Sequence, residues 1–153
     1  MSVDPPDTAE RTLRSREFAV LYAQVQQFYG DQMRILDAHG TERWTGTFTD
    51  DAVLVPPSPS EPVRARAGVV RYLRAGAERL RRTGGRPAHW VGMLDVRPQE
   101  DGSLHTRCSA LVYATPGAGG SPVLYVCVME DVLVRTRGTW RTAYRRVVRD
   151  DLR

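Results

Sequence analysis

The first half of the chain places its core-facing side chains at the three- and four-residue spacing of an amphipathic helix. The pattern starts after Ser15, a suitable N-terminal cap, and ends at Gly40. Residues 1–14 are expected to form an N-terminal arm, although residues 7–10 offer a capping box for a short helix. The core-facing positions of the long helix are Phe18, Leu21, Tyr22, Val25, Phe28, Tyr29, Gln32 and Leu36.

Two shorter helices and one strand are expected next. Thr41 can cap a short helix in which Trp44 and Phe48 stack one turn apart. Residues 52–55 read as a short strand, and the prolines of residues 56–62 indicate a loop. A further helical pattern runs from about Gly68 to a stop at Gly84, with its apolar face at Val69, Leu73, Ala77 and Leu80.

The second half of the chain has the shorter period of β-strands. Asp101-Gly102 and Arg137-Gly138 are turn signals, and residues 115–122 form a link rich in glycine and proline. The pattern therefore predicts a four-stranded meander over residues 88–96, 104–114, 123–135 and 140–148.

Helices followed by antiparallel strands are typical of an α+β domain. We therefore expect residues 15–150 to form one domain, in which three N-terminal helices pack on a strongly bent, mostly antiparallel sheet. A long helix laid across the concave face of such a sheet leaves a cone-shaped barrel with an internal cavity.

Composition narrows the choice of partners. Hydrophobic residues make up 41% of the chain, yet no run approaches the roughly 18 apolar residues of a membrane span. The N-terminus lacks the order of a signal peptide, so we expect a cytoplasmic protein. The net charge is +4, and all 22 basic residues are arginines, which indicates a GC-rich genome such as that of an actinomycete. These arginines are scattered along the chain, and this argues against nucleic-acid binding.

Neither the cysteines nor the histidines indicate a metal site or a cofactor. Cys108 and Cys127 lie in strongly apolar β segments and are expected to be buried side chains without a disulfide. His39, His89 and His105 have no second ligand at zinc-like spacing, so we expect no metal.

Four stretches in this order and spacing resemble a known superfamily. The resemblance is to the nuclear-transport-factor-two-like proteins, in particular to SnoaL-like polyketide cyclases, scytalone dehydratase and the β subunits of ring-hydroxylating dioxygenases. It spans roughly residues 15–150. The stretches are residues 28–37 followed by Trp44, residues 48–52, residues 89–92, and residues 130–135 with 138–140 and 145–147.

The resemblance implies proton-transfer chemistry. His89 is similar to the cavity histidine of scytalone dehydratase, and Asp37 is similar to the carboxylate that pairs with it. An imidazole both takes and gives protons near neutral pH, and a carboxylate on its other nitrogen fixes the tautomer. The implied activity is that of a cofactor-independent cyclase, dehydratase or isomerase acting on a polyketide-like molecule.

The sequence also departs from scytalone dehydratase. The catalytic tyrosines of that enzyme fall near Leu36 and Val55, and its second cavity histidine falls near Tyr113. Gln32 stands where relatives often have an acidic residue, and its helical phase allows it to hydrogen-bond a ligand. The alternative functions are therefore a structural subunit, like the dioxygenase β subunit, or a small-molecule binding protein.

Polar and aromatic side chains are the candidate contacts of a flat, partly aromatic substrate. Asp131 and its neighbour Glu130 are also expected to pair with Arg145 and Arg146 of the following strand. Strand alternation places Trp90 opposite His89, where it can support a homodimer through the sheet face. The candidate substrate-binding residues are Tyr29, Gln32, Trp44, Tyr72, Tyr113, Tyr125 and Asp131.

Overall fold

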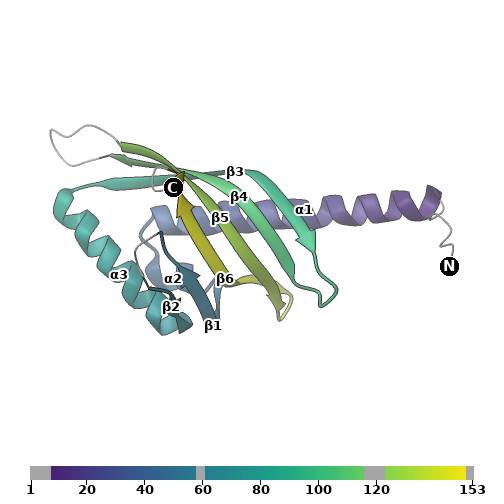
Figure 1. Ribbon diagram of the computed structural model, residues 1–153, viewed down its shortest axis with the longest axis horizontal. Coiled ribbons are helices and arrows are strands. Elements are labelled where there is room, and N and C mark those ends of the chain that lie inside the picture. The colour runs from purple at the N-terminus through teal and green to yellow at the C-terminus, as the bar shows by residue number, and fades with distance from the viewer. Residues whose placement is uncertain (1–7, 58–60, 116–122, 151–153) are drawn as a thin grey trace.

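The computed structural model describes residues 8–57, 61–115 and 123–150, which form three helices and a six-stranded sheet (Figure 1). The α+β fold class predicted from the sequence is confirmed. The helices are α1 (Thr8–Asp37), α2 (Thr41–Thr45) and α3 (Ala65–Thr83). The strands are β1 (Phe48–Val55), β2 (Val63–Arg64), β3 (Arg86–Pro98), β4 (Leu104–Thr115), β5 (Val123–Thr136) and β6 (Thr139–Arg149).

The sheet is mixed and open. Its strands lie in the order β2-β1-β6-β5-β4-β3, and every neighbouring pair is antiparallel except β1 and β6. Because the first and last strands of this order do not pair in the described part of the chain, the sheet does not close into a barrel. Helices flank both edges instead: α1 contacts β3, and α3 contacts β1 and β2. Tyr22 ties α1 to β3 by donating a hydrogen bond to the carbonyl oxygen of Leu94 at 3.0 Å.

The long helix starts earlier than the sequence pattern predicts. α1 begins at Thr8, so the second half of the expected N-terminal arm is helical, while residues 1–7 lie outside the described residues. This end of α1 extends past the sheet (Figure 1), and residues 13–20 are exposed, including Phe18, which we expected in the core. A helical segment without packing partners needs no apolar stripe, so periodicity cannot find its start.

Two elements near the middle of the chain also differ from the prediction. β1 starts at Phe48, whereas the sequence pattern predicts a start at residue 52. The prediction is late because aspartates such as Asp50 and Asp51 are uncommon in strands. Both aspartates are exposed, so their charges remain in water. β2 has only two residues, too few for any alternation to show, and it directly follows the predicted loop.

Three clusters of buried apolar side chains form the core: Ala110, Val112 and Cys127 pack together on β4 and β5, and two bigger clusters hold the other members. Of these two, the larger cluster lies between α1 and the concave face of the sheet, and the smaller one joins α2, β1 and α3. In the smaller cluster the rings of Trp44 and Phe48 pack with centroids 4.6 Å apart. The larger cluster includes Val25, Tyr29, Met33, Val96, Leu104, Cys108, Met129 and Leu133, and the smaller one Trp44, Phe48, Ala52, Leu54 and Val69.

Irregular positions bend the sheet around α1. The pairing of β3 with β4 shifts between Gly92 and Asp95, where Met93 has a positive φ of 52°. Such a bulge bends a strand and increases its twist. The predicted turn at Arg137-Gly138 is confirmed, with φ values of 53° and 79° that suit the tight hairpin joining β5 to β6.

Candidate active site

Asp37 and His89 are in direct contact although they come from different elements. Asp37 is the last residue of α1, and His89 lies on the edge strand β3. One carboxylate oxygen of Asp37 lies 2.6 Å from Nδ1 of His89, and the other accepts a hydrogen bond from the backbone N–H of His89 at 3.0 Å. The carboxylate therefore fixes both the ring and the backbone of the histidine.

This contact assigns the histidine tautomer. An ionised carboxylate only accepts hydrogen bonds, so Nδ1 carries a proton, and in the neutral ring Nε2 then presents its lone pair. No described residue forms a hydrogen bond to Nε2. The side chains of His89 and Asp37 are 19% and 27% exposed, so the pair is reachable from solvent. A neutral imidazole held in this way is arranged to accept a proton.

His89 lines a cavity of about 450 Å³ between the helices and the concave face of the sheet. This volume lies within the usual range for small-molecule sites. Of the predicted substrate contacts, Trp44, Tyr72 and Tyr125 line the cavity together with His89. The remaining wall is mostly apolar and includes Met33, Leu36, Leu54, Leu73, Ala110, Val112, Cys127, Met129 and Val147.

The strand register explains which residues face this cavity. His89, Val112 and Tyr125 are aligned across β3, β4 and β5, and all three face inward. Trp90 and Tyr113 belong to the opposite parity and lie exposed on the convex face. Tyr113 therefore points away from this cavity, because its neighbour Val112 takes the inward position, and a substrate contact by Tyr113 stays a prediction. The orientation of Trp90 agrees with the alternation argument.

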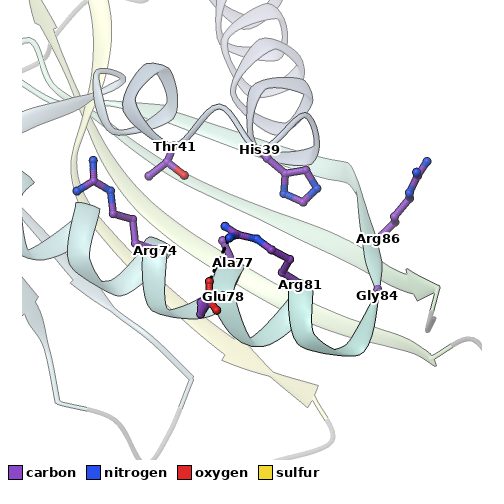
Figure 2. A pocket seen from close by; sticks show the side chains of 9 residues that line it. His39, Thr41, Arg74, Ala77, Glu78, Arg81, Gly84 and Arg86 are labelled. Atoms are coloured by element: carbon purple, nitrogen blue, oxygen red, sulfur yellow. Dashed lines mark ion pairs between the residues drawn. The ribbon is translucent and has the colours of Figure 1, made fainter.

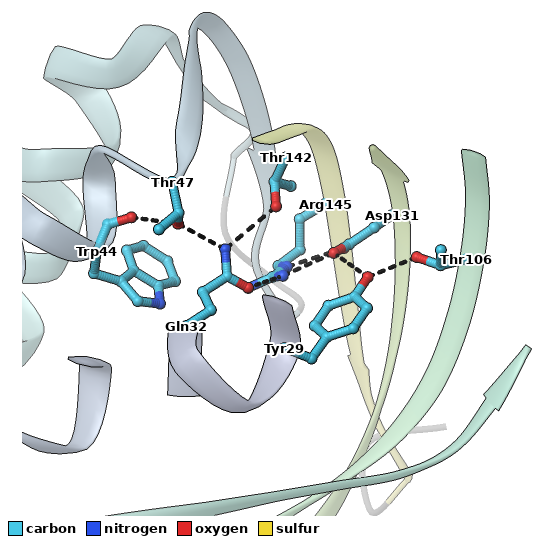
Figure 3. Close-up of polar contacts among 8 residues, drawn as sticks. All are labelled: Tyr29, Gln32, Trp44, Thr47, Thr106, Asp131, Thr142 and Arg145. Carbon is cyan, nitrogen blue, oxygen red and sulfur yellow. Dashed lines mark hydrogen bonds and ion pairs between the residues drawn. The ribbon is translucent and has the colours of Figure 1, made fainter. Parts of the chain in front are cut away.

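A buried polar network lies behind the cavity wall, which it reaches through Arg145 (Figure 3). Arg145 donates to both carboxylate oxygens of Asp131 at 2.9 and 2.7 Å, and to Oε1 of Gln32 at 2.6 Å. Asp131 also accepts from the Tyr29 hydroxyl at 2.7 Å, and that hydroxyl lies 2.6 Å from Oγ1 of Thr106. The predicted pairing of Asp131 with Arg145 is thus confirmed.

Three predicted substrate contacts belong to this network rather than to the cavity wall. Tyr29, Gln32 and Asp131 are buried, and none of them lines the cavity. Gln32 also donates to the hydroxyls of Thr47 at 2.8 Å and Thr142 at 3.3 Å. Protein groups bind the polar atoms of these three side chains, so their direct contact with a ligand stays a prediction. They hold Arg145, which does line the cavity.

The network sets the protonation of its members. Burial alone would lower the pKa of Arg145, but the adjacent Asp131 carboxylate more than offsets this and raises the pKa above its usual value. Burial, reinforced by the Asp131 charge, also raises the pKa of the Tyr29 hydroxyl and brings the pKa of the Cys108 thiol to about 12. The buried region around Asp131 thus holds an ionised arginine, a neutral phenol and a neutral thiol.

Trp44 offers an unused hydrogen-bond donor. Its side chain is 3% exposed and lines the cavity, yet its indole Nε1–H has no hydrogen-bond partner among the described residues. A buried donor without a partner is costly, and a ligand oxygen in the cavity would relieve that cost. The sequence pattern identified Trp44 as a wall residue but gave no sign of this free donor.

A larger hollow, of about 730 Å³, lies elsewhere on the molecule (Figure 2). It lies between the turn after α1, the outer face of α3 and the start of β3, and it contains neither His89 nor Asp37. His39 and arginines line it, and two of these arginines are already in ion pairs: Arg81 with Glu78 at 3.3 Å and Arg74 with Glu42 at 3.0 Å. We therefore take the cavity beside His89 as the candidate site.

Metal ligands and membrane spans are absent from the part of the chain that the structure describes. These residues contain no group of three or more histidine, cysteine or acidic side chains placed to hold a metal ion. Among their helices, none combines the length and the apolar character needed to cross a membrane. Cys108 and Cys127 are buried and form no disulfide, as the sequence predicts.

Comparison with known proteins gives a family and close structural neighbours. Residues 19–146 match the SnoaL-like domain. Aln2 from a Streptomyces species is 32% identical, with a TM-score of 0.77 over 86% of this chain and 92% of that chain. A Catenulispora acidiphila protein in complex with S-DNPA is 34% identical, with a TM-score of 0.77 over 87% of this chain and 96% of that chain.

A more distant neighbour shares the fold alone. A putative scytalone dehydratase from Novosphingobium aromaticivorans is 14% identical, with a TM-score of 0.76 over 88% of this chain and 87% of that chain. No curated protein matches this chain.

Proposed function

Because the chain belongs to the SnoaL-like domain family, we propose that it is a cofactor-independent enzyme that cyclises, dehydrates or isomerises a polyketide-like molecule in secondary metabolism. The observation that carries this proposal is the hydrogen bond of 2.6 Å between Asp37 and Nδ1 of His89, at the wall of a cavity of small-molecule size. The Catenulispora relative, which holds S-DNPA, supports a small-molecule ligand.

The proposed chemistry starts with His89. Its Nε2 removes a proton from a carbon next to a substrate carbonyl, and the electron pair of the C–H bond moves toward the carbonyl oxygen. The Asp37 carboxylate stabilises the imidazolium that forms. Return of the proton to a departing hydroxyl gives dehydration, and its return to another carbon gives isomerisation. Attack of the new carbanion on a second carbonyl of the same molecule breaks the π bond of that carbonyl, and the resulting alkoxide takes the proton back from the imidazolium, which completes cyclisation.

The negative charge that develops on the carbonyl oxygen needs a hydrogen-bond donor. Trp44 lines the cavity, and its indole N–H is a buried donor without a partner among the described residues. A donor preorganised in a site of low polarity stabilises developing charge more than the same group does in water. We assign Trp44 this role, with Tyr72 and Tyr125 as the aromatic walls of the site.

Three further proposals concern the setting of the enzyme. The protein acts in the cytoplasm, it comes from an actinobacterium, and it is a homodimer through the convex face of the sheet. The exposed side chains of Trp90, Leu111 and Leu124 on that face support the dimer. The all-arginine basic composition supports the actinobacterial source.

The test uses S-DNPA and synthetic bicyclic and tricyclic hydroxyketones as trial substrates in D2O. Mass spectrometry and NMR would follow deuterium uptake next to the carbonyl, loss of water and ring closure. The wild-type protein should catalyse at least one of these changes, and His89→Gln should slow it by about 10²- to 10⁴-fold. His105→Gln is the matched control, because His105 is exposed on the convex side of β4 and should leave the rate unchanged.

Full activity of His89→Gln would contradict the proton-transfer proposal. Tight ligand binding by the wild-type protein with no exchange or turnover of any trial compound would instead favour the small-molecule binding alternative.

A further inference from the structure

We propose that Arg145 is a substrate-binding residue, whose Nη1 donates a hydrogen bond to a carbonyl oxygen of the substrate. Its guanidinium lines the cavity that also contains His89, and only 3% of the side chain is exposed. The inference rests on the proposed function only in taking this cavity as the substrate site. It adds a chemical class, a substrate that places a neutral carbonyl oxygen against this part of the wall.

Three of the five N–H donors of Arg145 are used within the protein. Nε and Nη2 donate to the two carboxylate oxygens of Asp131 at 2.9 and 2.7 Å, and Nη2 also donates to Gln32 at 2.6 Å. Nη1 forms no hydrogen bond with a described residue. Both of its N–H groups therefore remain available to a ligand.

Nη1 is also open to the cavity. Some donors among the described side chains are fully enclosed and lack a partner, such as the indole nitrogen of Trp44 and Nε of Arg66, but Nη1 of Arg145 is not one of them. It therefore reaches free volume, and the hollow that Arg145 lines is this cavity. A ligand oxygen there would satisfy a donor that the protein itself leaves unpaired.

The guanidinium is held in a fixed orientation. Its carbon atom lies 5.4 Å from the ring centroid of Phe48, 5.9 Å from that of Tyr29 and 6.0 Å from that of Trp44. The hydrogen bonds to Asp131 and Gln32 fix its plane as well (Figure 3). A donor that the protein has already oriented binds an oxygen with less loss of side-chain entropy than an arginine that moves freely.

The surroundings of Nη1 favour a neutral carbonyl oxygen. The nearby side-chain oxygens of Asp131 and Gln32 already accept hydrogen bonds. A substrate hydroxyl could accept from Nη1, but its own hydrogen would have to compete for acceptors that are in use. A carboxylate would lie close to the charge of Asp131, which would repel it. A ketone oxygen meets neither cost, because it only accepts and carries no charge.

The test compares rigid tricyclic probes that differ only at the central carbon. They are 9-fluorenone, a ketone; 9-fluorenol, an alcohol; fluorene, which has no oxygen; and fluorene-9-carboxylate, an anion. Calorimetry on the full wild-type chain should show that the ketone binds about tenfold or more tightly than fluorene. The alcohol and the carboxylate should both bind less tightly than the ketone.

Arg145→Lys keeps a positive charge beside Asp131 but removes Nη1. It should weaken binding of the ketone by about 5- to 20-fold and change binding of fluorene by less than about twofold. Arg79→Lys is the matched control, because Arg79 lines the same cavity and undergoes the same substitution. It should leave both affinities unchanged.

Nitrogen-15 NMR of the wild-type protein tests the contact directly, even if Arg145→Lys fails to fold. A guanidinium held in this way gives separate Nη signals, which nuclear Overhauser contacts with the rings of Tyr29, Trp44 and Phe48 identify. Fluorenone should shift the Nη1 protons downfield, as hydrogen bonding does, and fluorene should not.

Each of several results would overturn the assignment of Arg145. They are equal affinity for fluorenone and fluorene, tighter binding of the alcohol or the carboxylate, binding of no probe, equal losses in the two lysine variants, and Nη1 signals that fluorenone leaves unchanged.

The variant His89→Gln separates this inference from the proposed function. If it keeps full turnover while the wild-type protein prefers the ketone, the role of Arg145 stands and the proton-transfer mechanism fails. If it loses turnover while the wild-type protein shows no ketone preference, the mechanism stands and the role of Arg145 is overturned.

Discussion

At the scale of single residues, the contact between Asp37 and His89 determines which ring nitrogen of His89 can act as a base. The carboxylate fixes the proton on Nδ1 because it can only accept, and Nε2 is left free to take a proton. An asparagine at position 37 has nearly the same shape, but its amide can donate to Nδ1. That would favour the opposite tautomer, with the proton on Nε2, which cannot act as a base.

Asp37→Asn is therefore expected to lower the turnover rate by about 10²-fold or more without unfolding the protein. The turnover rate is measured on the compound identified in the activity screen, and ¹⁵N NMR of the His89 ring reports the tautomer directly. Asp31→Asn on the same helix is the control, since Asp31 is exposed and pairs with Arg34 at 2.6 Å. An unchanged tautomer with a reduced rate would assign Asp37 a different role.

Cys108 gives a prediction about pH. Burial, followed by the charge of Asp131, raises the pKa of its thiol from 9.0 to about 12. Because the folded-state pKa is the higher one, the stabilising contribution is complete below about pH 9 and is lost as the pH rises toward 12. In that window the free energy of unfolding should fall by about 1.4 kcal/mol per pH unit for this one group.

Urea unfolding of the wild-type protein and of Cys108→Val across this window measures the effect. The variant lacks the thiol, so its stability should fall less steeply with pH, whatever its stability at neutral pH. The buried Tyr29 hydroxyl remains in both proteins, and its pKa stays raised in the variant because burial, and not the Cys108 charge, is the largest cause. Parallel curves would show that the thiol does not titrate as the buried environment implies.

At the scale of secondary-structure elements, the network around Arg145 joins parts that are far apart in the chain. Gln32 and Tyr29 come from α1, Thr106 from β4, Asp131 from β5 and Arg145 from β6. The side chains of Arg145 and Asp131 are 3% and 0% exposed. A buried ion pair stabilises little relative to apolar residues, but removing one partner leaves an uncompensated charge in the core.

Asp131→Asn is accordingly expected to lower the free energy of unfolding by about 3–5 kcal/mol. Chemical denaturation followed by far-UV circular dichroism measures it. Glu130→Gln, one residue away, is the control. Glu130 is half-exposed and lies 3.5 Å from Arg107, so its loss should cost less than about 1 kcal/mol. Equal effects of the two substitutions would mean that solvent reaches the network.

At the scale of the whole molecule, the sequence predicted the structural elements that local residue patterns determine. The helices, the long strands β3 to β6 and the hairpin turns follow from periodicity and turn residues, and the family resemblance is confirmed by the match over residues 19–146. The contact of Asp37 with His89 came from the resemblance, because these positions lie 52 residues apart, beyond the reach of any local pattern.

The rest depended on tertiary structure. The parallel pairing of β1 with β6 and the two-residue strand β2 leave no local signal. Helical phase predicted that Tyr29 and Gln32 face the core, but only the packed structure shows that Tyr29 binds Asp131 and that Arg145 joins Asp131 to Gln32. The sequence analysis did not identify Arg79 as a cavity residue. Its position in the helical pattern of α3 is one that an arginine exposed to solvent could equally occupy.

The convex face of the sheet carries apolar side chains that the single chain does not bury. Trp90 is 72% exposed and Leu124 is 62% exposed, and the register places Trp90 beside Leu111 and Leu124 beside Tyr113. These four side chains form a continuous apolar patch on one side of β3, β4 and β5. Apolar patches of this kind on soluble domains commonly mark an interface, and a two-fold dimer brings the same patch of two copies together.

We therefore expect the wild-type protein to be a dimer, and Trp90→Arg to shift it to a monomer while His89 on the other face keeps its activity. Light scattering coupled to size-exclusion chromatography measures the mass of each. Val20→Arg, which places the same charge on an exposed apolar position of α1, should remain dimeric. A monomeric wild-type protein would rule out this face as the interface. A dimer that both substitutions leave intact would also rule it out, because two buried arginines at the centre of the interface would force the dimer apart.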